Sequence, residues 1–265
     1  CKAWHSEFLA FLYFHMINLN PKLLNLHPSL KIFNFDSIGS TNLFLKEEVE
    51  SGKLLQPAFC IAEQQTSGYG QHGRNWDSTQ ELSPLTCSFA FPIDYGLEKL
   101  LLKSIPVALI VRRLLVKYSK QDFQVKWPND IYENGRKVSG CLIEIVRSRV
   151  LKTPFVIFGL GVNLSSNNSK GYGSVESLEV GLFLNDLSIE LFDFFTSEDG
   201  LNGSEVITEW GKHDYFSIGE KVCVYDTGSF REGEYLGINA LFQPEIRIDG
   251  KVVAFSTGQA SIRKV

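Results

Sequence analysis

Apolar and polar positions alternate in short runs along most of the middle of the chain, a period that predicts β-strands. We expect strands at residues 30–35, 59–63, 86–91, 123–127, 138–146 and 155–164. Between the fourth and fifth of these lies Asn134-Gly135, a dipeptide that favours a two-residue hairpin turn. The strands on either side of it should therefore be antiparallel neighbours.

Four other segments favour helices. The first follows Thr41 or Asn42, either of which can cap it, and extends to Gly52. The second covers residues 100–118, where Pro106 is tolerable if Ser104 caps the helix. Shorter helices are expected at residues 187–195 and 204–210. Together these segments predict an α+β fold, in which a mixed, mostly antiparallel sheet carries helices.

The C-terminal segment has a different pattern. Short alternating runs at residues 221–225, 231–238, 245–248 and 252–256 are separated by glycines, which predicts a small β-barrel. We therefore expect an N-terminal extension (residues 1–29), a large domain (residues 30–215) and a small β domain (residues 216–265), with the boundary near Phe216.

Composition narrows the classes of partner. Of 265 residues, 44% are apolar and 21% are charged, which is ordinary for a folded globular protein. The formal net charge is -4 and no Lys/Arg-rich arm is present, so we expect no nucleic-acid partner. The apolar run at residues 8–17 is too short to span a bilayer, so we expect no membrane association. Met16 is the only methionine, and we expect it to be the natural initiator.

The cysteines and histidines exclude some kinds of site. The five cysteines are scattered and form no C-x-x-C pair, so we expect no disulfide framework. Cys60, Cys87 and Cys141 lie in apolar runs, where buried thiols are expected rather than nucleophiles; this usage suits a reducing cytoplasm. No two histidines have a metal-ligand spacing, so a bound metal should be a hard cation such as magnesium.

One glycine-rich segment contains Gly68, Gly70 and Gly73 in a G-x-G-x-x-G spacing. A dinucleotide-binding turn is not expected, because such a turn opens a helix and this segment leads into another strand. Its free backbone N–H groups and the neighbouring Arg74 could hold a phosphate-bearing intermediate. A flexible connection is the alternative.

A second segment, residues 125–130, ends a strand with Lys126-Trp127-Pro128-Asn129-Asp130. Pro128 favours an extended Trp127 and a rigid turn that presents Asn129 and Asp130. The hairpin then brings Lys137 towards the same cleft. Two lysines and an aspartate on one hairpin suit a reaction in which the carboxylate of a substrate attacks the α-phosphate of ATP. The two approaching anions repel each other and need fixed cations between them. A solvated hairpin face is the alternative.

In a third segment, Gly159 and Gly161 alternate with apolar residues along a strand. The glycines remove side chains from one face, so we expect something to pack closely there. Asn163 follows and could place its amide on a nucleotide or a metal-bound water.

Taken in order, these segments resemble the biotin protein ligases, and the resemblance extends from about Phe33 to Val265. The matching residues are Ser40-Thr41-Asn42, Gln65, Gly68-Tyr69-Gly70-Gln71-His72-Gly73-Arg74, Lys126-Trp127-Pro128-Asn129-Asp130, Lys137, Gly140 and Gly161-Val162-Asn163. The Lys-Trp-Pro-Asn-Asp string is highly specific. The resemblance implies the fold of class II synthetases and biotin ligases followed by an SH3-like barrel, in a short form without an N-terminal DNA-binding domain and its repressor role.

The resemblance also implies a reaction in two steps. Biotin and MgATP give biotinyl-5′-adenylate and pyrophosphate, and a lysine of a biotin carboxyl carrier protein then displaces AMP. A subunit of acetyl-CoA carboxylase or another carboxylase is the expected carrier. Family members occur as monomers or dimers, so a homodimer is possible.

Roles for individual residues follow from the same resemblance. The implied catalytic residues are Lys137, Lys126 and Asp130, with Asp130 also a magnesium ligand. The implied biotin-binding residues are Ser40, Thr41, Asn42, Gln65, Tyr69, Gly70, Gln71, Lys137 and Gly140. The implied ATP- and adenylate-binding residues are Gly68, Gly73, Arg74, Trp76, Lys126, Asn129, Asp130, Asn163 and Arg263.

The glycine-rich segment departs from the family at two positions. Many members have arginine where this chain has Tyr69 and Gln71, so two possible cations are missing. Electrostatic retention of the anionic adenylate should be weaker, and we expect more free adenylate to escape than from arginine-bearing relatives. A Gln71→Arg variant should leak less adenylate into solution; unchanged leakage would refute this explanation.

Two alternatives to a biotin ligase stay open. A lipoate protein ligase shares the fold and the adenylation chemistry but lacks the Lys-Trp-Pro-Asn-Asp string. A non-catalytic biotin-binding module would not need Lys126, Asp130 and Lys137.

Overall fold

The computed structural model describes residues 24–76, 84–96, 100, 103–151, 153–165, 171–197, 202–226 and 229–265. Met16 and the apolar run at residues 8–17 lie outside these ranges. No helix within them is long and apolar enough to cross a membrane.

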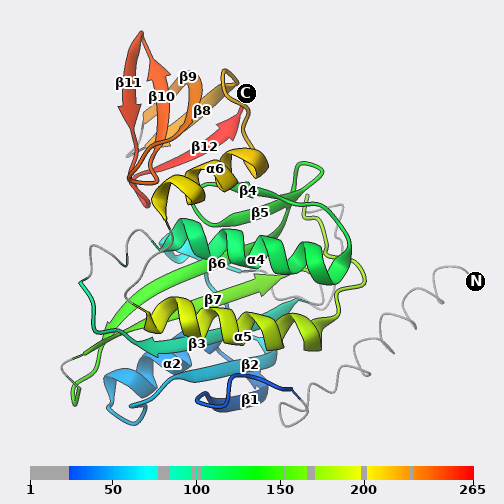
Figure 1. The fold of residues 1–265 in the computed structure, drawn as a ribbon, viewed down its shortest axis with the longest axis vertical. Coiled ribbons are helices and arrows are strands. Elements are labelled where there is room, and N and C mark those ends of the chain that lie inside the picture. The colour runs from blue at the N-terminus through cyan, green and yellow to red at the C-terminus, as the bar shows by residue number, and fades with distance from the viewer. Residues whose placement is uncertain are drawn as a thin grey trace, which may run out of the picture.

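A seven-stranded sheet forms the larger part of the molecule (Figure 1). Its strands, in spatial order, are β1 (Lys31–Ile38), β2 (Ala58–Gln65), β3 (Leu85–Pro92), β7 (Pro154–Val162), β6 (Arg136–Arg147), β5 (Asp130–Glu133) and β4 (Gln124–Lys126). β1 and β2 are parallel and every other neighbouring pair is antiparallel. The prediction of a mixed, mostly antiparallel sheet is confirmed.

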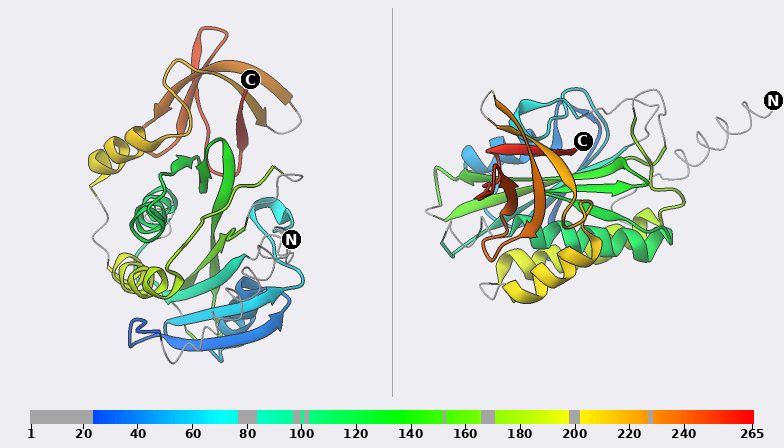
Figure 2. Two further views of the ribbon diagram at one scale, coloured as in Figure 1. Left: turned by 90° about the vertical axis from the view of Figure 1, so that its right-hand side faces the viewer. Right: turned by 90° about the horizontal axis from the view of Figure 1, so that it is seen from above.

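Helices cover both faces of this sheet. α4 (Ser104–Ser119) and α5 (Val180–Thr196) lie side by side on one face, and α2 (Thr41–Glu50) packs on the other (Figures 1 and 2). The period-two alternation of the strands supplies both interfaces. In β2, Phe59 and Ile61 join the core under α4 and α5, whereas Ala58 and Cys60 join the core under α2.

The starts of α2, α4 and α5 differ from the sequence prediction. The cap of α2 is Ser40, whose hydroxyl oxygen accepts a hydrogen bond from the Leu43 N–H, and Thr41 and Asn42 are already helical. Ser104 does not cap α4 but is its first helical residue. α5 begins at Val180 rather than residue 187, because Phe183 and Leu184 are fully buried and this packing outweighs the weak helix formers Gly181 and Asn185.

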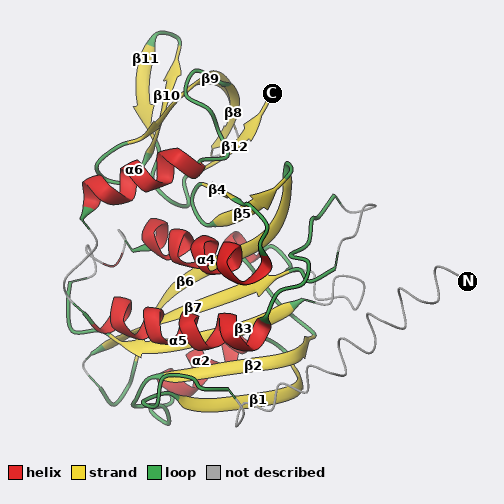
Figure 3. Ribbon diagram, turned by 45° about the vertical axis from the view of Figure 1, so that its right-hand side comes forward, coloured by secondary structure: helices red, strands yellow, loops and turns green. Residues whose placement is uncertain are grey.

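A second, five-stranded sheet follows α6 (Gly203–His213) (Figure 3). Its strands, in spatial order, are β11 (Lys251–Ala254), β10 (Pro244–Ile248), β9 (Ser229–Ile238), β8 (Lys221–Asp226) and β12 (Ala260–Lys264). All neighbouring pairs are antiparallel. The expected small SH3-like β domain is confirmed as this sheet.

The two sheets share a hydrophobic core across the expected boundary at Phe216. This core contains Val125 and Trp127 of the β4 region together with Tyr235 and Ile246 of the second sheet. The Trp127 indole N–H also donates to the Phe242 carbonyl oxygen at 3.0 Å. The C-terminal sheet is therefore held directly against the strand that leads into residues 128–130.

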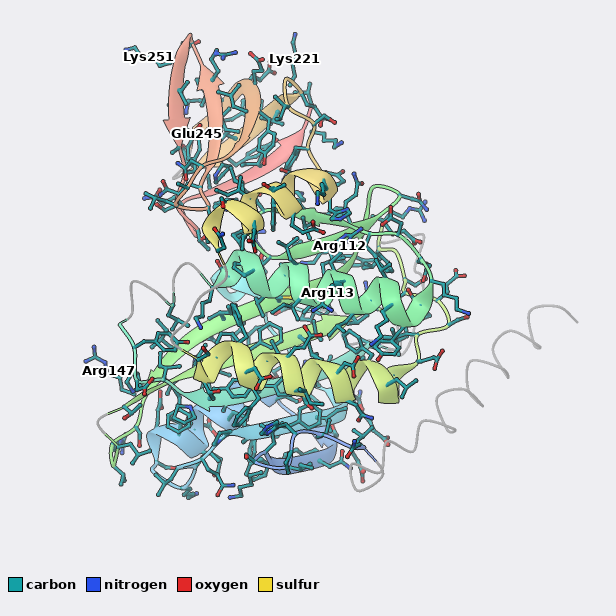
Figure 4. The ribbon with its side chains drawn as sticks, in the orientation of Figure 1. Arg112, Arg113, Arg147, Lys221, Glu245 and Lys251 are labelled. Carbon is teal, nitrogen blue, oxygen red and sulfur yellow. The ribbon has the colours of Figure 1, made fainter. Side chains whose placement is uncertain are left out.

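Asp214 reinforces this junction at the end of α6. Its carboxylate accepts hydrogen bonds from the Tyr235 hydroxyl at 2.5 Å and the Trp210 indole N–H at 3.0 Å. Burial raises the pKa of Asp214 to about 6, and these hydrogen bonds act in the opposite direction. Figure 4 labels Lys221, Glu245 and Lys251, which lie on the strands of the C-terminal sheet.

Arg112 on α4, labelled in Figure 4, fixes the start of β4 from the other side. Its guanidinium donates to the Phe123 carbonyl oxygen at 2.5 Å and to Asp122 Oδ1 at 2.7 Å. Although Arg112 is only 7% exposed, its charge is paired, so its burial is consistent with a structural role.

The cysteines behave as the sequence predicts. Cys60, Cys87, Cys141 and Cys223 are buried free thiols. Burial raises the pKa of Cys60 to about 12 and raises those of Cys87 and Cys141 further. Neutral thiols of this kind pack as small apolar groups and are poor nucleophiles.

Candidate active site

A cavity of about 990 Å³ opens on the α2 face of the large sheet and extends to the C-terminal sheet. Its walls come from the start of α2, the glycine-rich loop, the β4–β6 hairpins, β7 and β12. A volume of this size accommodates a drug-sized ligand or a larger adenylate.

The floor of the cavity is a patch of sheet without side chains. Along β7 the residues that face α2 change from Phe155 and Ile157, which are buried under α2, to Gly159 and Gly161. On β6, Gly140 lies directly beside Gly161. The floor is lowered where the apolar core ends, and this is why a cavity forms on an otherwise packed face.

Side chains from other elements lie on these glycines. A Cβ atom added at Gly161 would lie 2.3 Å from the Trp76 ring, and one added at Gly159 would lie 2.3 Å from Asn42 Oδ1. The prediction that something packs closely against the β7 glycines is confirmed. Trp76 also lies beside Lys137, whose Nζ is 5.4 Å from the centre of the indole.

One wall of the cavity is a chain of uncharged hydrogen-bonding groups. Gln65 Oε1 accepts from the Thr41 backbone N–H at 2.8 Å and from its hydroxyl at 3.1 Å. The Thr41 and Ser88 hydroxyl oxygens are 2.6 Å apart, and the Ser88 hydroxyl donates to Asn42 Oδ1 at 2.5 Å. Ser88 is fully buried. The wall is therefore fixed by side chains from α2, β2 and β3.

The opposite wall carries Lys137 and Asp130, whose Nζ and Oδ1 atoms are 2.7 Å apart. In a regular strand Lys137 would face away from Gly140, three positions later. The ladder between β5 and β6 shifts by one residue, however, so that Asp130 pairs with Gly140 while Tyr132 pairs with Lys137. This bulge turns Lys137 to the cavity and leaves Val138 buried in the core.

Cations gather at this end of the cavity. Among the described lining residues, the positively charged side chains are Arg74, Lys126, Lys137, Arg263 and Lys264, and Asp130 is the acidic one. The pKa of Lys126 is lowered to about 8, chiefly by burial; Asp130 acts to raise it, and Lys137, Arg263 and Arg74 act in the same direction as burial. Neighbouring cations that destabilise one another's charge form a site suited to an anion.

Aromatic rings hold the cations in place. Lys126 Nζ lies 4.8 Å from the centre of the Tyr132 ring and 3.2 Å from its hydroxyl oxygen. On the side of the second sheet, the Arg263 guanidinium carbon lies 4.8 Å from the centre of the Tyr225 ring. Arg263 lies on β12, so the C-terminal sheet contributes a cation to the cavity.

The glycine-rich loop folds as a short hairpin over the cavity. Gly70 N–H donates to the Arg74 carbonyl oxygen at 2.7 Å, and Trp76 N–H donates to the Gly68 carbonyl oxygen at 2.9 Å. Gly73 adopts a φ of +68°, which glycine tolerates better than other residues. Among the described residues the next element after the loop is strand β3, in agreement with the prediction that this is not a dinucleotide-binding turn.

The structure brings most of the residues singled out from the sequence around this one cavity. Those that line it are Ser40, Thr41, Asn42, Gln65, Tyr69, Gly70, Gln71, Arg74, Trp76, Lys126, Asn129, Asp130, Lys137, Gly140, Asn163 and Arg263. Gly68 and Gly73 do not line the cavity. Gly68 accepts the Trp76 hydrogen bond of the loop hairpin, and Gly73 supplies its positive φ angle.

Two of these residues make structural hydrogen bonds with their amides. Asn163 Nδ2 donates to the Gly173 carbonyl oxygen at 3.2 Å, and Asn129 Nδ2 donates to the Cys141 carbonyl oxygen. These bonds fix neighbouring backbone at the cavity. Their expected contacts with ATP stay predictions.

Ser88, Tyr132 and Tyr215, which line the cavity, and Glu144, which contacts two lining residues, were not expected from the sequence. Ser88 had a usable signal, because Thr86 and Ser88 put two polar groups on one face of an apolar strand. Glu144 was also visible as an acidic residue inside the apolar run of β6. Tyr215 had none, because it reaches the cavity through the pairing of its segment with β4, where its backbone N–H donates to the Val125 carbonyl oxygen at 2.8 Å.

The cavity fits magnesium only as part of a MgATP complex. Among the described residues no three acidic, histidine or cysteine side chains form a metal-binding group, and Asp130 is the acidic residue of the lining. One carboxylate, with substrate phosphates and water as the other ligands, is a usual magnesium environment.

The chain is similar to known proteins. The family model of the biotin/lipoate A/B protein ligases matches residues 34–163. The bifunctional ligase/repressor BirA of Escherichia coli is 26% identical over 243 residues, which cover 85% of this chain and 72% of the relative. The biotin--[acetyl-CoA-carboxylase] ligase of Mycobacterium tuberculosis is 31% identical over 130 residues, covering 48% of this chain and 47% of that protein.

Solved structures give the same fold. The biotin protein ligase of Aquifex aeolicus in complex with biotin and ATP superposes with a TM-score of 0.65 at 23% identity. The match covers 89% of this chain and 99% of that structure, so the similarity includes both sheets.

Proposed function

We propose, from the premise that the chain belongs to the biotin/lipoate A/B protein ligase family, that it is a biotin protein ligase. It activates biotin with ATP to biotinyl-5′-AMP and transfers biotin to a lysine of a carrier protein. The observation that carries this proposal is a single cavity that joins an uncharged polar wall to a cluster of cations.

The uncharged wall suits the ureido ring of biotin. That ring is neutral and needs donors and acceptors in a slot that holds no charge. Ser40, Thr41, Asn42 and Gln65 supply such groups, and the side chains of Thr41 and Asn42 are held by Ser88. A wall that is fixed before the ligand arrives loses little conformational entropy on binding.

The cationic end suits the first chemical step. One oxygen of the biotin carboxylate attacks the α-phosphorus of ATP, a P–O bond forms, and pyrophosphate leaves with the electron pair of the broken bond. Lys137 and Lys126 stabilise the negative charges that approach each other. Magnesium, when bound with ATP, would be held by Asp130 and would neutralise phosphate charge.

The second step forms the amide. The neutral amine of a carrier lysine attacks the carbonyl carbon of the adenylate, the C–O bond to phosphate breaks, and AMP leaves with the electron pair. The amine proton is released. A biotin carboxyl carrier protein is the proposed acceptor; the name of the mycobacterial relative gives acetyl-CoA carboxylase as the acceptor of that protein. The free thiols of the described residues suit a cytoplasmic location.

Exchange of pyrophosphate into ATP tests this proposal. The purified protein is incubated with ATP, labelled pyrophosphate and either biotin or lipoate. We expect exchange that depends on biotin. Exchange with lipoate alone would show that lipoate, and not biotin, is the acid that the protein activates. The absence of exchange with either acid would favour a non-catalytic binding module.

Ionisation of Lys126 should be visible in the pH dependence of kcat/KM for ATP. Because burial lowers the pKa of Lys126 to about 8, the residue is mostly charged below that pH and loses its proton above it. We expect kcat/KM for ATP to fall about tenfold per pH unit above the pKa. A Lys126→Arg variant keeps its charge, so the decline should disappear; a decline that persists in this variant would assign it to another group.

A further inference from the structure

Glu144 lies beside the cavity, where three elements far apart in the sequence meet, and it contacts the lining residues Asn42 and Tyr69. Its Oε2 accepts hydrogen bonds from the Tyr69 hydroxyl at 2.6 Å and from Asn42 Nδ2 at 3.0 Å. Its Oε1 is 2.7 Å from Lys46 Nζ. Asn42 and Lys46 belong to α2, Tyr69 to the glycine-rich loop and Glu144 to β6. We call these four residues the Glu144 cluster.

The cluster has a defined charge state at neutral pH. Burial alone would raise the pKa of Glu144, but the hydrogen bonds from Lys46, Tyr69 and Asn42 outweigh it and hold the pKa below its ordinary value. Burial, followed by the nearby Glu144 carboxylate, raises the pKa of Tyr69. Glu144 is therefore an anion and Tyr69 a neutral donor, a pairing that gives a strong, charge-assisted hydrogen bond.

The cluster is continuous with the uncharged wall. Asn42 donates to Glu144 through Nδ2 and accepts from Ser88 through Oδ1, so its amide is fixed at both ends. Ser88 in turn contacts Thr41, which is bonded to Gln65. The position of the glycine-rich loop is therefore linked to that of the wall through one carboxylate and one amide.

We propose that Glu144 is a positioning residue for biotin: it fastens the glycine-rich loop through Tyr69 and orients the Asn42 amide at the cavity wall. This inference rests on the proposed function for the identity of the ligand. Neither Glu144 nor the Tyr69 hydroxyl belongs to the cation group that acts on phosphate. The role of Glu144 is to hold the loop and wall in the arrangement that captures biotin.

Loss of the Glu144 contacts should weaken biotin binding without slowing the chemical step. A loosened loop and a free Asn42 amide must be ordered again when biotin binds, so affinity falls. At saturating biotin the ordered complex reacts at its normal rate, because Lys126 and Lys137 are unchanged. The effect should therefore appear in KM for biotin and not in kcat.

Tyr69→Phe, Glu144→Gln and their double variant test this. We expect each single variant to raise KM for biotin about tenfold, with kcat within about twofold of the original. The double variant should be no worse than the poorer single variant, because both changes break the same contact. Tyr118→Phe is the matched control, since the Tyr118 hydroxyl donates to Asp186 at 2.5 Å between α4 and α5, on the opposite face of the sheet from the cavity.

A second readout needs no substrate. Amide hydrogen exchange at residues 68–76 and trypsin cleavage after the exposed Arg74 report the loop in the ligand-free protein. Both should become several-fold faster in Tyr69→Phe and Glu144→Gln, and neither should change in Tyr118→Phe. Faster exchange in a protein that does not activate biotin would support the loop contact while refuting the proposed ligand. Unchanged exchange together with unchanged KM, or a loss confined to kcat, would overturn the positioning role.

Discussion

Replacing Lys137 with methionine is expected to lower the rate of biotinyl-adenylate formation by about 100- to 1,000-fold. Lys137 Nζ lies 2.7 Å from Asp130 Oδ1 and beside the Trp76 ring, in the part of the cavity where the cations gather. Without it, the carboxylate and the α-phosphate approach each other with less shielding. Methionine keeps most of the length of the side chain, so the loss is chiefly one of charge.

Pre-steady-state measurement of pyrophosphate release would show this effect, since it isolates the first step. Lys137→Arg restores the ion pair to Asp130 and should keep the protein as stable as the original while recovering part of the rate. Lys212→Met is the control: Lys212 is exposed on α6 and pairs with Glu209, so activity should not change. A Lys137→Met enzyme that releases pyrophosphate at the original rate would remove Lys137 from the chemistry.

The second large effect is expected from a single methyl group on the floor of the cavity. In Gly159→Ala the new Cβ would lie 2.3 Å from Asn42 Oδ1 and 2.8 Å from its amide carbon. Asn42 cannot move aside without breaking its hydrogen bonds with Ser88 and Glu144. Losing two buried hydrogen bonds costs about 2–4 kcal/mol, so KM for biotin should rise by about 30- to 1,000-fold.

Titration with biotin and thermal unfolding, measured on the same preparations, separate the local effect from loss of the fold. Gly211→Ala is the matched control, because a Cβ there meets nothing within 4 Å and alanine favours the helix that contains it. The control should bind biotin normally and unfold at the same or a higher temperature. Normal biotin affinity in Gly159→Ala would show that the Asn42 amide is free to move.

Local signals in the sequence account for much of the fold. Asn134-Gly135 forms the predicted two-residue turn, and both residues adopt the positive φ angles that this turn requires. The strand that pairs with β6 across the turn is β5, which was not expected, so the expected pairing of residues 123–127 with residues 138–146 is wrong and β4 pairs with β5 instead. The alternation in β7 predicts both the buried face and the bare glycine floor, since a period of two assigns Gly159 and Gly161 to the same side.

The remaining features depend on contacts that no local pattern encodes. Lys137 faces the cavity because of a bulge next to it, and the regular alternation of β6 would have turned it away. Ser88 and Glu144 act through partners on other strands and on α2. Arg263 reaches the cavity because the second sheet docks on a core that includes Trp127, and Tyr215 reaches it because its segment pairs with β4.

The central claim is that a biotin carboxylate attacks the α-phosphorus of ATP in this cavity. Biotin with heavy oxygen in its carboxylate, turned over with ATP and an amine acceptor such as hydroxylamine, tests it directly. Mass spectrometry of the products should find one heavy oxygen in AMP and none in pyrophosphate, because the carboxylate oxygen that bonds to phosphorus stays with AMP when the adenylate is cleaved. Unlabelled AMP, or heavy oxygen in inorganic phosphate with ADP as the nucleotide product, would contradict the account.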